Sequence, residues 1–359
     1  MQKKGYSRKD KEFEEVWRKV MSELRKDPVV DRWVIIANER SLKPYDFGVH
    51  GEIRKPGPCV FCEGMEMHTP KEVFSVRDKH TEINQPGWRV RVVPNKFPAL
   101  RIEEPFAHCI DGICESLSGS GAHEVIIETP DHYLELGDLS VKHIAEVMYV
   151  YRERMCDLER DHRFRYCIIF KNQGALAGAS IQHAHSQLIA IPVIPKRVKE
   201  ELLGADKYYQ EKGHCIFCDI VQYHQNNNQR MIIENEQFLA FVPYAPRFPY
   251  EIWILPKKHS SHFMKIEDQE LNYLSEILKK LLVSMKKSLN DSPYNLILHA
   301  APFERKEEKS YQDSYHWHME MLPTITKVAG FEWGTGFYIN PVIPENAAEI
   351  LRKNIPIKI

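Results

Sequence analysis

The sequence lacks the features of a membrane protein or of a protein that binds nucleic acid polymers. It contains no apolar run of the ~18 residues that a transmembrane helix requires. Its 49 Lys and Arg nearly balance its 50 Asp and Glu, which gives a formal net charge of -1. No bulk attraction for a nucleic acid is therefore expected, and any polyanion that the protein binds should be small and held locally.

An export signal is also missing. Residues 1–26 are charged and lack the apolar core of a signal peptide. The spacing of Trp17, Val20, Met21 and Leu24 instead favours a surface helix. We therefore expect a protein of the reducing cytoplasm.

Cysteine is present, but half of it follows one pattern. In a long chain without an export signal, paired cysteines near histidines indicate a metal site more than a disulfide. Two Cys-x-x-Cys pairs occur, Cys59/Cys62 and Cys215/Cys218, while Cys109, Cys114, Cys156 and Cys167 fit no such pattern.

Four blocks of sequence recur in the same order, which indicates a duplicated unit. The first copies are residues 58–63, 91–98, 123–132 and 183–187, and the second copies are residues 214–219, 240–249, 250–259 and 316–320. The chain is long enough for two domains. We predict them at residues 27–195 and 196–359.

Each unit combines strand and helix patterns. Short β-branched or alternating segments predict strands, and two long segments with apolar side chains at helical spacing predict helices packed on a sheet. The predicted fold class is α+β, with an antiparallel sheet and packed helices in each unit. The expected strands include residues 89–93, 124–128, 167–170 and 187–191, and the expected helices are residues 140–160 and 271–289.

A zinc site is predicted in the first unit. Zinc takes about four soft or borderline ligands at tetrahedral corners. Cys59 and Cys62 supply two of them from one turn. Among the 17 histidines, the repeat selects His132 and His183 as the other two, because both have counterparts in the second unit.

The segment around His185 has the composition of a phosphoryl-transfer site. On a strand, the side chains of His183 and His185 point the same way, so one can bind metal while the other faces the cleft. The small residues at 171–180 let the backbone approach a ligand, and N–H groups there would cradle phosphate oxygens. A neutral imidazole is nucleophilic near pH 7. Ser180 and Gln187 add neutral hydrogen-bond donors.

These motifs resemble the histidine-triad superfamily, in its galactose-1-phosphate uridylyltransferase branch, over nearly the whole chain. The family motif His-Pro-His-Gly-Gln stands here as His183-Ala184-His185-Ser186-Gln187. The resemblance implies a ping-pong mechanism in which a nucleotide sugar gives its nucleotidyl group to His185 and a sugar phosphate then accepts it. It also implies that Gln187 stabilises the intermediate, that magnesium is not required and that the protein is a homodimer.

The resemblance extends to metal ligands and substrate contacts. It assigns zinc to Cys59, Cys62, His132 and His183. The implied substrate contacts are Asn172 and Ser180 at the phosphates, Gly178 as a further substrate-binding residue, Asn95 on the base and ribose side, and the basic pair Arg40 and Lys43.

Two reactions fit this resemblance. The first expectation is transfer of UMP from a UDP-hexose to a hexose 1-phosphate. However, Ala184 and Ser186 replace the usual proline and glycine, and residues 330–341 lack the lysine and glutamine with which the uridylyltransferases contact the hexose. These features resemble ADP-glucose phosphorylase, in which inorganic phosphate accepts the nucleotide, so that reaction is the alternative.

The second unit is expected to be structural. His318 matches the position of the nucleophile, but Glu320 replaces the glutamine and would repel a phosphoryl group. Two ligand sets compete there for His316, and we favour the Cys2His2 set because paired thiolates bind zinc tightly, with iron as the alternative metal at this site. The first set is Cys215, Cys218, His259 and His316, and the second, at the positions of another metal site of the family, is Glu201, His299, His316 and His318.

Two other classes of function compete with nucleotidyl transfer. Nucleotide hydrolases of the superfamily commonly carry His-x-His-x-His, whereas Gln187 stands at the third position and favours transfer. A zinc-stabilised nucleotide-binding module without activity would not need the complete set of Asn172, Ser180, His185 and Gln187.

Overall fold

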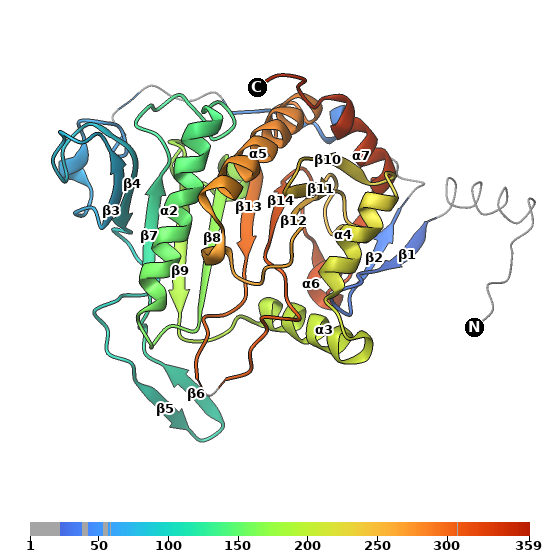
Figure 1. The fold of residues 1–359 in the computed structure, drawn as a ribbon, viewed down its shortest axis with the longest axis horizontal. Coiled ribbons are helices and arrows are strands. Elements are labelled where there is room, and N and C mark those ends of the chain that lie inside the picture. Colours follow the sequence, from blue (N-terminus) through green and yellow to red (C-terminus); the bar gives the residue numbers. More distant parts are fainter. Residues whose placement is uncertain (1–21, 38–41, 53–56, 58, 307) are drawn as a thin grey trace, which may run out of the picture.

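A ten-stranded antiparallel sheet forms the centre of the molecule (Figure 1). The computed structural model describes residues 22–37, 42–52, 57, 59–306 and 308–359. The strand order across the sheet is β10-β11-β12-β14-β13-β8-β9-β7-β4-β3. These strands are β3 (Phe74–Arg77), β4 (Trp88–Pro94), β7 (Ala122–Ile127), β8 (Tyr166–Gln173), β9 (His185–Ile191), β10 (Met231–Glu234), β11 (Phe238–Phe241), β12 (Ile252–Pro256), β13 (Tyr294–His299) and β14 (His318–Pro323).

Each predicted unit contributes five strands in the same internal order. The halves β3-β4-β7-β9-β8 and β10-β11-β12-β14-β13 meet where β8 pairs with β13, with Asn172 opposite Asn295. The prediction of an α+β fold with an antiparallel sheet and packed helices in each unit is confirmed. The two sheets are halves of one continuous sheet, and the boundary between residues 195 and 196 stays a prediction.

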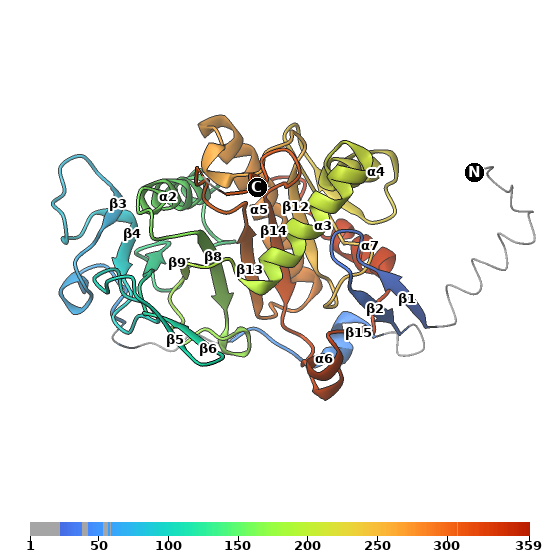
Figure 2. The same ribbon diagram turned by 90° about the horizontal axis from the view of Figure 1, so that it is seen from below.

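Two long helices lie side by side across one face of the sheet, as Figures 1 and 2 show together. They are α2 (Val141–Glu159) and α5 (Asp268–Ser288), close to the predicted ranges. The Ser140 side chain accepts a hydrogen bond from the His143 backbone N–H and so caps α2. Their apolar stripes are buried against the sheet, including Met148 and Met155 of α2 and Leu278 and Leu281 of α5.

Shorter helices complete the fold. Helices α3 (Lys196–Lys212) and α4 (Ile216–Asn226) pack on the other face of the second half, where Leu202 and Phe217 are buried with Leu239 and Leu255. The helices and 3-10 turns are η2 (Pro44–Phe47), η3 (Glu66–His68), η4 (Ala175–Ala177), α3 (Lys196–Lys212), α4 (Ile216–Asn226), η5 (Phe263–Lys265), α6 (Gly330–Thr335) and α7 (Pro344–Lys353).

The strand register shifts one of the repeat matches by one residue. Gln187 lies opposite Val125, and Glu320 lies opposite Trp253. Val125 and Trp253 therefore hold matching positions, whereas the sequence blocks align Val125 with Ile252. The pairing of β12 with β14 decides this register, and similar apolar residues in both strands hide the offset in the sequence.

A small second sheet corrects the expectation of an N-terminal helix. Residues 23–26 form strand β1 (Glu23–Lys26), which pairs with β2 (Trp33–Ile36), and β2 pairs with β15 (Tyr338–Asn340). Arg25 forms an ion pair with Glu345 at 3.0 Å. Tertiary pairing thus overrides the helical spacing at Leu24, while Trp17, Val20 and Met21 lie outside the described residues.

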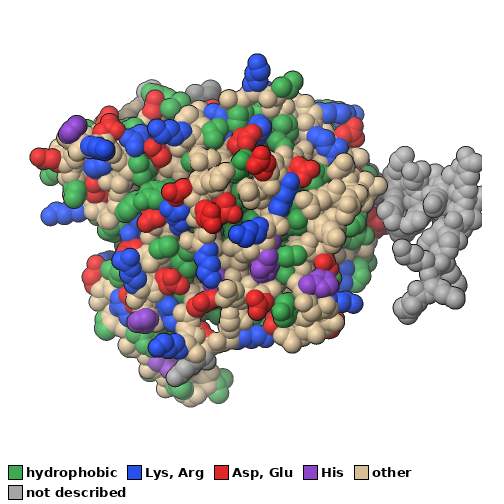
Figure 3. Space-filling model, viewed as in Figure 1, with side chains coloured by type: hydrophobic (Ala, Val, Ile, Leu, Met, Phe, Trp, Pro, Cys, Tyr) green, Lys and Arg blue, Asp and Glu red, His purple; other side chains and the backbone are tan. Residues whose placement is uncertain are grey.

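Two further features lie at the surface, an exposed hairpin and interspersed basic and acidic side chains. Strands β5 (His108–Asp111) and β6 (Cys114–Leu117) form an exposed hairpin at the lower edge in Figure 1. On the face drawn in Figure 3, basic and acidic side chains are interspersed. Among the described residues, no helix has both the length and the apolar character needed to span a bilayer.

Candidate active site

His185 begins strand β9 with one ring nitrogen committed and the other available. The ring is buried, with 6% of its surface exposed, and Nδ1 lies 2.8 Å from the carbonyl oxygen of His183. A carbonyl only accepts, so Nδ1 carries the proton and Nε2 carries the lone pair. Nε2 makes no hydrogen bond to the described residues. Burial, and then the charge of Lys171, lower the pKa of His185, so the ring is neutral near pH 7.

The predicted zinc ligands of the first unit gather at one point. Cys59, Cys62, His132 and His183 place their ligand atoms within 4.8 Å of one another. The Cys59 Sγ to His183 Nδ1 and Cys62 Sγ to His132 Nδ1 distances are both 3.6 Å. Tetrahedral zinc, with bonds of about 2.3 Å to sulfur and 2.0 Å to nitrogen, separates such atoms by about 3.6 Å. The four residues therefore fit zinc.

Hydrogen bonding orients His183 for metal binding. Its Nε2 lies 2.7 Å from the carbonyl oxygen of Thr129, so Nε2 donates and Nδ1 turns its lone pair toward the cysteines. Strand β9 begins at His185, so His183 lies just before the strand rather than within it. Both rings nevertheless pack edge-on against Phe61, with centroids 6.2 and 5.5 Å away.

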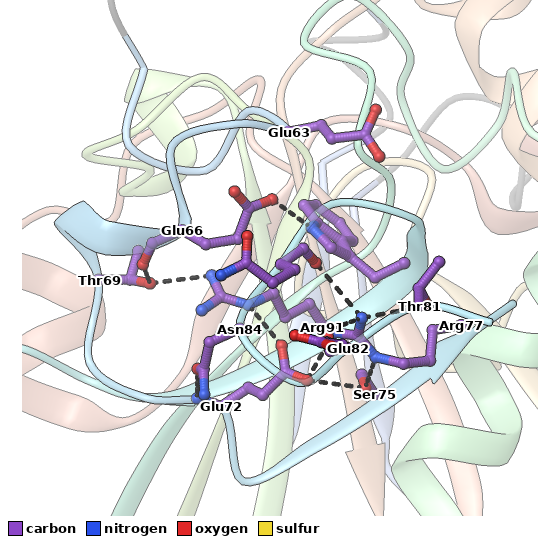
Figure 4. Close-up of polar contacts among 12 residues, drawn as sticks. Glu63, Glu66, Thr69, Glu72, Ser75, Arg77, Thr81, Glu82, Asn84 and Arg91 are labelled. Atoms are coloured by element: carbon purple, nitrogen blue, oxygen red, sulfur yellow. Dashed lines mark hydrogen bonds and ion pairs between the residues drawn. The ribbon is translucent and has the colours of Figure 1, made fainter. Parts of the chain in front are cut away.

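A polar brace holds the segment that follows the Cys59–Cys62 turn (Figure 4). Buried Arg91 of β4 donates to Thr69 Oγ1 and to Glu72 Oε2, both at 2.8 Å. Arg77 of β3 donates to the other oxygen of Glu72 at 2.6 Å. The segment is thereby fixed to the sheet edge, which limits movement of the metal ligands before it.

The loop of small residues at 174–180 is held by hydrogen bonds within its own backbone. Gly174 and Gly178 have φ angles of +84° and +93°, which glycine adopts without strain. The N–H groups of Ala177, Gly178 and Ala179 bond to carbonyl oxygens of the same loop. These three N–H groups are therefore committed within the loop, and a phosphate cradle would use other N–H groups of residues 171–180 or side chains of the loop.

Asn172 and Ser180 supply such side chains. Asn172 Oδ1 accepts from Asn295 Nδ2 at 2.8 Å, so its NH2 group is oriented toward Gly178, where a Cβ would come within 3.4 Å. Ser180 is exposed and lines a cavity of about 590 Å³ together with Cys59 and His132. His185 is not among the residues that line this cavity.

Gln187 and Asn95 are joined by a residue without a predicted role. His123 Nε2 lies 2.8 Å from Gln187 Oε1 and 3.1 Å from Asn95 Nδ2. The repeat placed His123 in a matched block, but nothing in its spacing indicated that it contacts two site residues. Pairing of strands β7 and β9 creates this contact.

A second unpredicted feature lies behind the nucleophile. Lys171 Nζ donates to Glu128 Oε2 at 2.9 Å and to the His185 carbonyl at 3.2 Å, with Lys171 and Glu128 no more than 1% exposed. The Ser186 hydroxyl donates to Glu128 Oε1 and accepts from Tyr151 at 2.5 Å. Charged residues directly after or within apolar runs, Glu128 after β7 and Lys171 in β8, were the sequence signal for this network.

The predicted basic pair is described only in part, because Lys43 lies within the described residues and Arg40 outside them. Lys43 precedes η2, and its ammonium lies 5.8 Å from the Tyr45 ring centroid. No hydrogen bond or ion pair of the described residues joins Lys43 to His185 or Gln187. Arg40 lies outside the described residues, so its predicted role stays a prediction.

The second unit contains a matching Cys2His2 group. Cys215, Cys218, His259 and His316 gather within 4.8 Å, and Cys218 Sγ lies 3.3 Å from His259 Nδ1 and 3.9 Å from His316 Nδ1. The Nε2 atoms of His259 and His316 bond to the carbonyl oxygens of Gln312 and Pro256 at 2.8 and 2.9 Å. These residues also fit zinc, and His316 turns toward the cysteines.

The alternative ligands form a separate cluster without His316. Glu201, His299 and His318 approach one another, but His299 also lies between two carboxylates, 3.2 Å from Glu201 and 3.4 Å from Glu320. Burial lowers the pKa of His299, but the two negative charges outweigh it and raise the value to about 10. Without a metal, this cluster is a buried charge network with His299 protonated, and a metal bound by Glu201, His299 and His318 would have to displace that proton.

His318 differs from His185 in access. The Phe217, Trp253 and His299 rings stack on it at centroid distances of 5.2, 5.0 and 4.8 Å. Its Nε2 is fully buried and has no hydrogen-bond partner among the described residues. Glu320, at the position of Gln187, is held by Arg247. The stacked rings therefore close the Nε2 atom of His318 off from solvent.

Comparison with known proteins decides the family. Residues 11–195 match the N-terminal domain of galactose-1-phosphate uridyl transferase, and residues 201–355 match its C-terminal domain. The chain belongs to the galactose-1-phosphate uridylyltransferase family. The resemblance inferred from the sequence is therefore confirmed.

The relatives of this family member carry two different names. The chain is 38% identical to ADP-glucose phosphorylase of Arabidopsis thaliana, over 92% of each chain. It is 29% identical to galactose-1-phosphate uridylyltransferase of Thermotoga maritima, over 93% of this chain and 98% of the relative. These relatives support nucleotidyl transfer on sugar phosphates as the general reaction.

Solved structures give the same picture. An ADP-glucose phosphorylase from Arabidopsis thaliana with bound ADP-glucose has a TM-score of 0.77, at 35% identity, over 92% of this chain and 99% of that chain. A uridylyltransferase structure has a TM-score of 0.71, at 27% identity, over 93% and 98%.

Proposed function

We propose that this protein transfers a nucleotidyl group from a nucleotide sugar through a covalent bond to Nε2 of His185. The observation that carries this proposal is the tautomer of His185, because Nδ1–H is fixed on the His183 carbonyl and the lone pair of Nε2 has no partner among the described residues. The matching His318 lacks this access, which leaves one nucleophile per chain.

The reaction then follows in two balanced steps. Nε2 attacks the α-phosphorus, the bond from phosphorus to the bridging oxygen breaks, and the electron pair leaves with the sugar 1-phosphate. An acceptor phosphate oxygen next attacks the same phosphorus, and the nitrogen–phosphorus bond breaks to restore the lone pair of Nε2. Gln187, Asn172 and Ser180 would supply neutral donors to the phosphoryl oxygens. The His183 carbonyl stabilises the positive charge that develops on the ring.

Zinc bound by the two Cys2His2 groups would stabilise the fold. Zinc held by Cys59, Cys62, His132 and His183 would fix the turn and the segment that precede the nucleophile, and the second Cys2His2 group would do the same for the other half. Neither metal is needed as a reactant in the two steps above.

For the substrate, we propose an ADP-hexose as donor and inorganic phosphate as acceptor. The 38% identity to ADP-glucose phosphorylase, against 29% to the Thermotoga uridylyltransferase, favours this alternative over the uridylyl transfer expected first from the sequence. Uridylyl transfer to a hexose 1-phosphate is the second candidate, because both halves match domains of that transferase. A homodimer and a cytoplasmic location remain predictions.

Intact-protein mass spectrometry tests the proposal. The protein is incubated with ADP-glucose or UDP-glucose without acceptor and kept out of acid. We expect a mass gain of one AMP from ADP-glucose, absent in His185→Ala and retained in the exposed control His162→Ala. A UMP gain alone would move the assignment to the uridylyltransferase reaction. The absence of any adduct, or an adduct that survives in His185→Ala, would overturn the mechanism.

A further inference from the structure

His123 lies on the strand next to the nucleophile strand and makes three contacts. Strand β7 pairs with β9 so that Gln187 faces Val125, two residues from His123 and on the same face of the sheet. His123 Nδ1 accepts from the backbone N–H of Ala99 at 3.1 Å. Its Nε2 lies 2.8 Å from Gln187 Oε1 and 3.1 Å from Asn95 Nδ2.

The Ala99 contact determines the tautomer of His123. A backbone N–H can only donate, so Nδ1 must carry a lone pair, and in the neutral ring the proton then sits on Nε2. Nε2–H therefore donates to the oxygen of the Gln187 amide. The amide nitrogen of Asn95 is also a donor, so its 3.1 Å approach adds no hydrogen bond and leaves its hydrogens for a ligand.

The tautomer in turn determines which end of Gln187 is available. An amide whose oxygen is held by His123 presents its NH2 group on the other side, and an NH2 group donates to a phosphoryl oxygen. With the amide reversed, its oxygen would face the phosphoryl oxygens and repel them. The orientation of this side chain therefore decides whether Gln187 helps or hinders charge development.

We propose that His123 is a positioning residue that holds Gln187 with its NH2 group toward the phosphoryl group on His185. This inference rests on the proposed nucleotidyl transfer. Through Asn95, the backbone of which donates to the His123 carbonyl at 2.8 Å, the same residue ties the predicted nucleoside contact to the phosphoryl donor.

A double-mutant cycle separates this role from general packing. The variants are Gln187→Ala, His123→Ala and the double substitution, assayed for kcat and KM with the nucleotide sugar that labels His185. Removing one donor of this kind costs on the order of 100-fold in kcat. We expect a loss of similar size in His123→Ala, a smaller change in KM, and no further loss in the double variant. Two losses that multiply would overturn the proposal, because His123 would then act independently of Gln187.

A conservative variant covers the case in which His123→Ala fails to fold. His123→Gln places an amide NH2 near the position of Nε2–H, so we expect it to recover most of the lost kcat. Recovery of folding, judged by circular dichroism, without recovery of kcat would overturn the proposal. The wild-type mass adduct is scored separately, so its absence reports failure of the proposed function and not of the positioning role. His162→Ala is the exposed control.

Discussion

At the scale of single residues, the network behind the nucleophile explains why this chain departs from the family motif. A glycine at position 186 would leave Glu128 without the Ser186 hydroxyl that donates to it. Glu128 in turn neutralises Lys171, which holds the carbonyl of His185. Burial and the charge of Glu128 keep the pKa of Tyr151 well above its usual range, so its hydroxyl stays protonated as a donor to Ser186. The serine is thus part of a buried charge pair and not an isolated substitution.

Removing only one partner of the Lys171–Glu128 pair should lower the free energy of unfolding more than neutralising both partners. In Lys171→Met, the carboxylate of Glu128 stays buried without its counter-charge, and we expect a loss of ~3–5 kcal/mol in the free energy of unfolding. The double variant Lys171→Met/Glu128→Gln should lose much less, since a neutral amide can still accept from Ser186. Urea unfolding measures both, with Lys286→Met as a half-exposed control that should change little. Equal losses of unfolding free energy in the single and double variants would contradict the assignment of Lys171 as the counter-charge of Glu128.

The His299 network gives a pH dependence of stability. The pKa of His299 is raised to about 10 in the folded protein, against about 6.5 when unfolded. Protonated His299 therefore contributes fully to the free energy of unfolding below a pH of about 6.5, which is its pKa in the unfolded chain. This contribution is lost as the pH rises from about 6.5 through 10. Urea midpoints should fall over this range, and less steeply in Glu320→Gln. A urea midpoint that rises from pH 7 to 10 would contradict a protonated His299. It would fit a neutral His299 that binds a metal together with Glu201 and His318.

At the scale of elements, the zinc ligands were predictable and much of their surroundings was not. The Cys-x-x-Cys pairs and the repeated histidines identify both groups, because ligand chemistry restricts the residue types. The brace of Arg91, Glu72 and Thr69 was not predictable, because ordinary charged and polar residues far apart in sequence meet only after β3 and β4 pair. The closed loop was missed for a similar reason, since its composition shows flexibility and not its internal hydrogen bonds.

The two Cys2His2 groups should hold two metal ions per chain. Elemental analysis of the purified protein should find about two zinc per chain, and Cys59→Ser should remove about one and lower the thermal midpoint. Cys109→Ser, on the exposed β5–β6 hairpin, is the matched control and should change neither value. A full zinc content in Cys59→Ser would show that this group does not bind the metal.

At the scale of the whole molecule, the sequence determined the fold class but not how the units join. Strand and helix periodicity gave the bounds of the four predicted strands and the two long helices to within a few residues, because burial sets that periodicity in each element. The pairing of β8 with β13, and of β2 with β15 across 302 residues from Ile36 to Tyr338, depends on contacts that no local pattern records. For the same reason, residues 23–36 pack with the C-terminal half although they precede the first matched block, at residues 58–63.

One continuous sheet also predicts one cooperative unfolding transition. Separating the chain at 195/196 would expose the edge of β13 that pairs with β8, and would remove Tyr166 from the core that it shares with Phe217 and Leu255. A fragment of 164 residues (196–359) has no other element to pair with the open edge of β13 or to cover the exposed core face. We expect the intact protein to show a single calorimetric transition with equal calorimetric and van't Hoff enthalpies. We expect residues 196–359 alone, even with zinc, to lack a sharp melting transition and dispersed amide resonances. Two separate transitions, or a stable C-terminal fragment, would instead show that the duplicated units fold independently and join only afterwards.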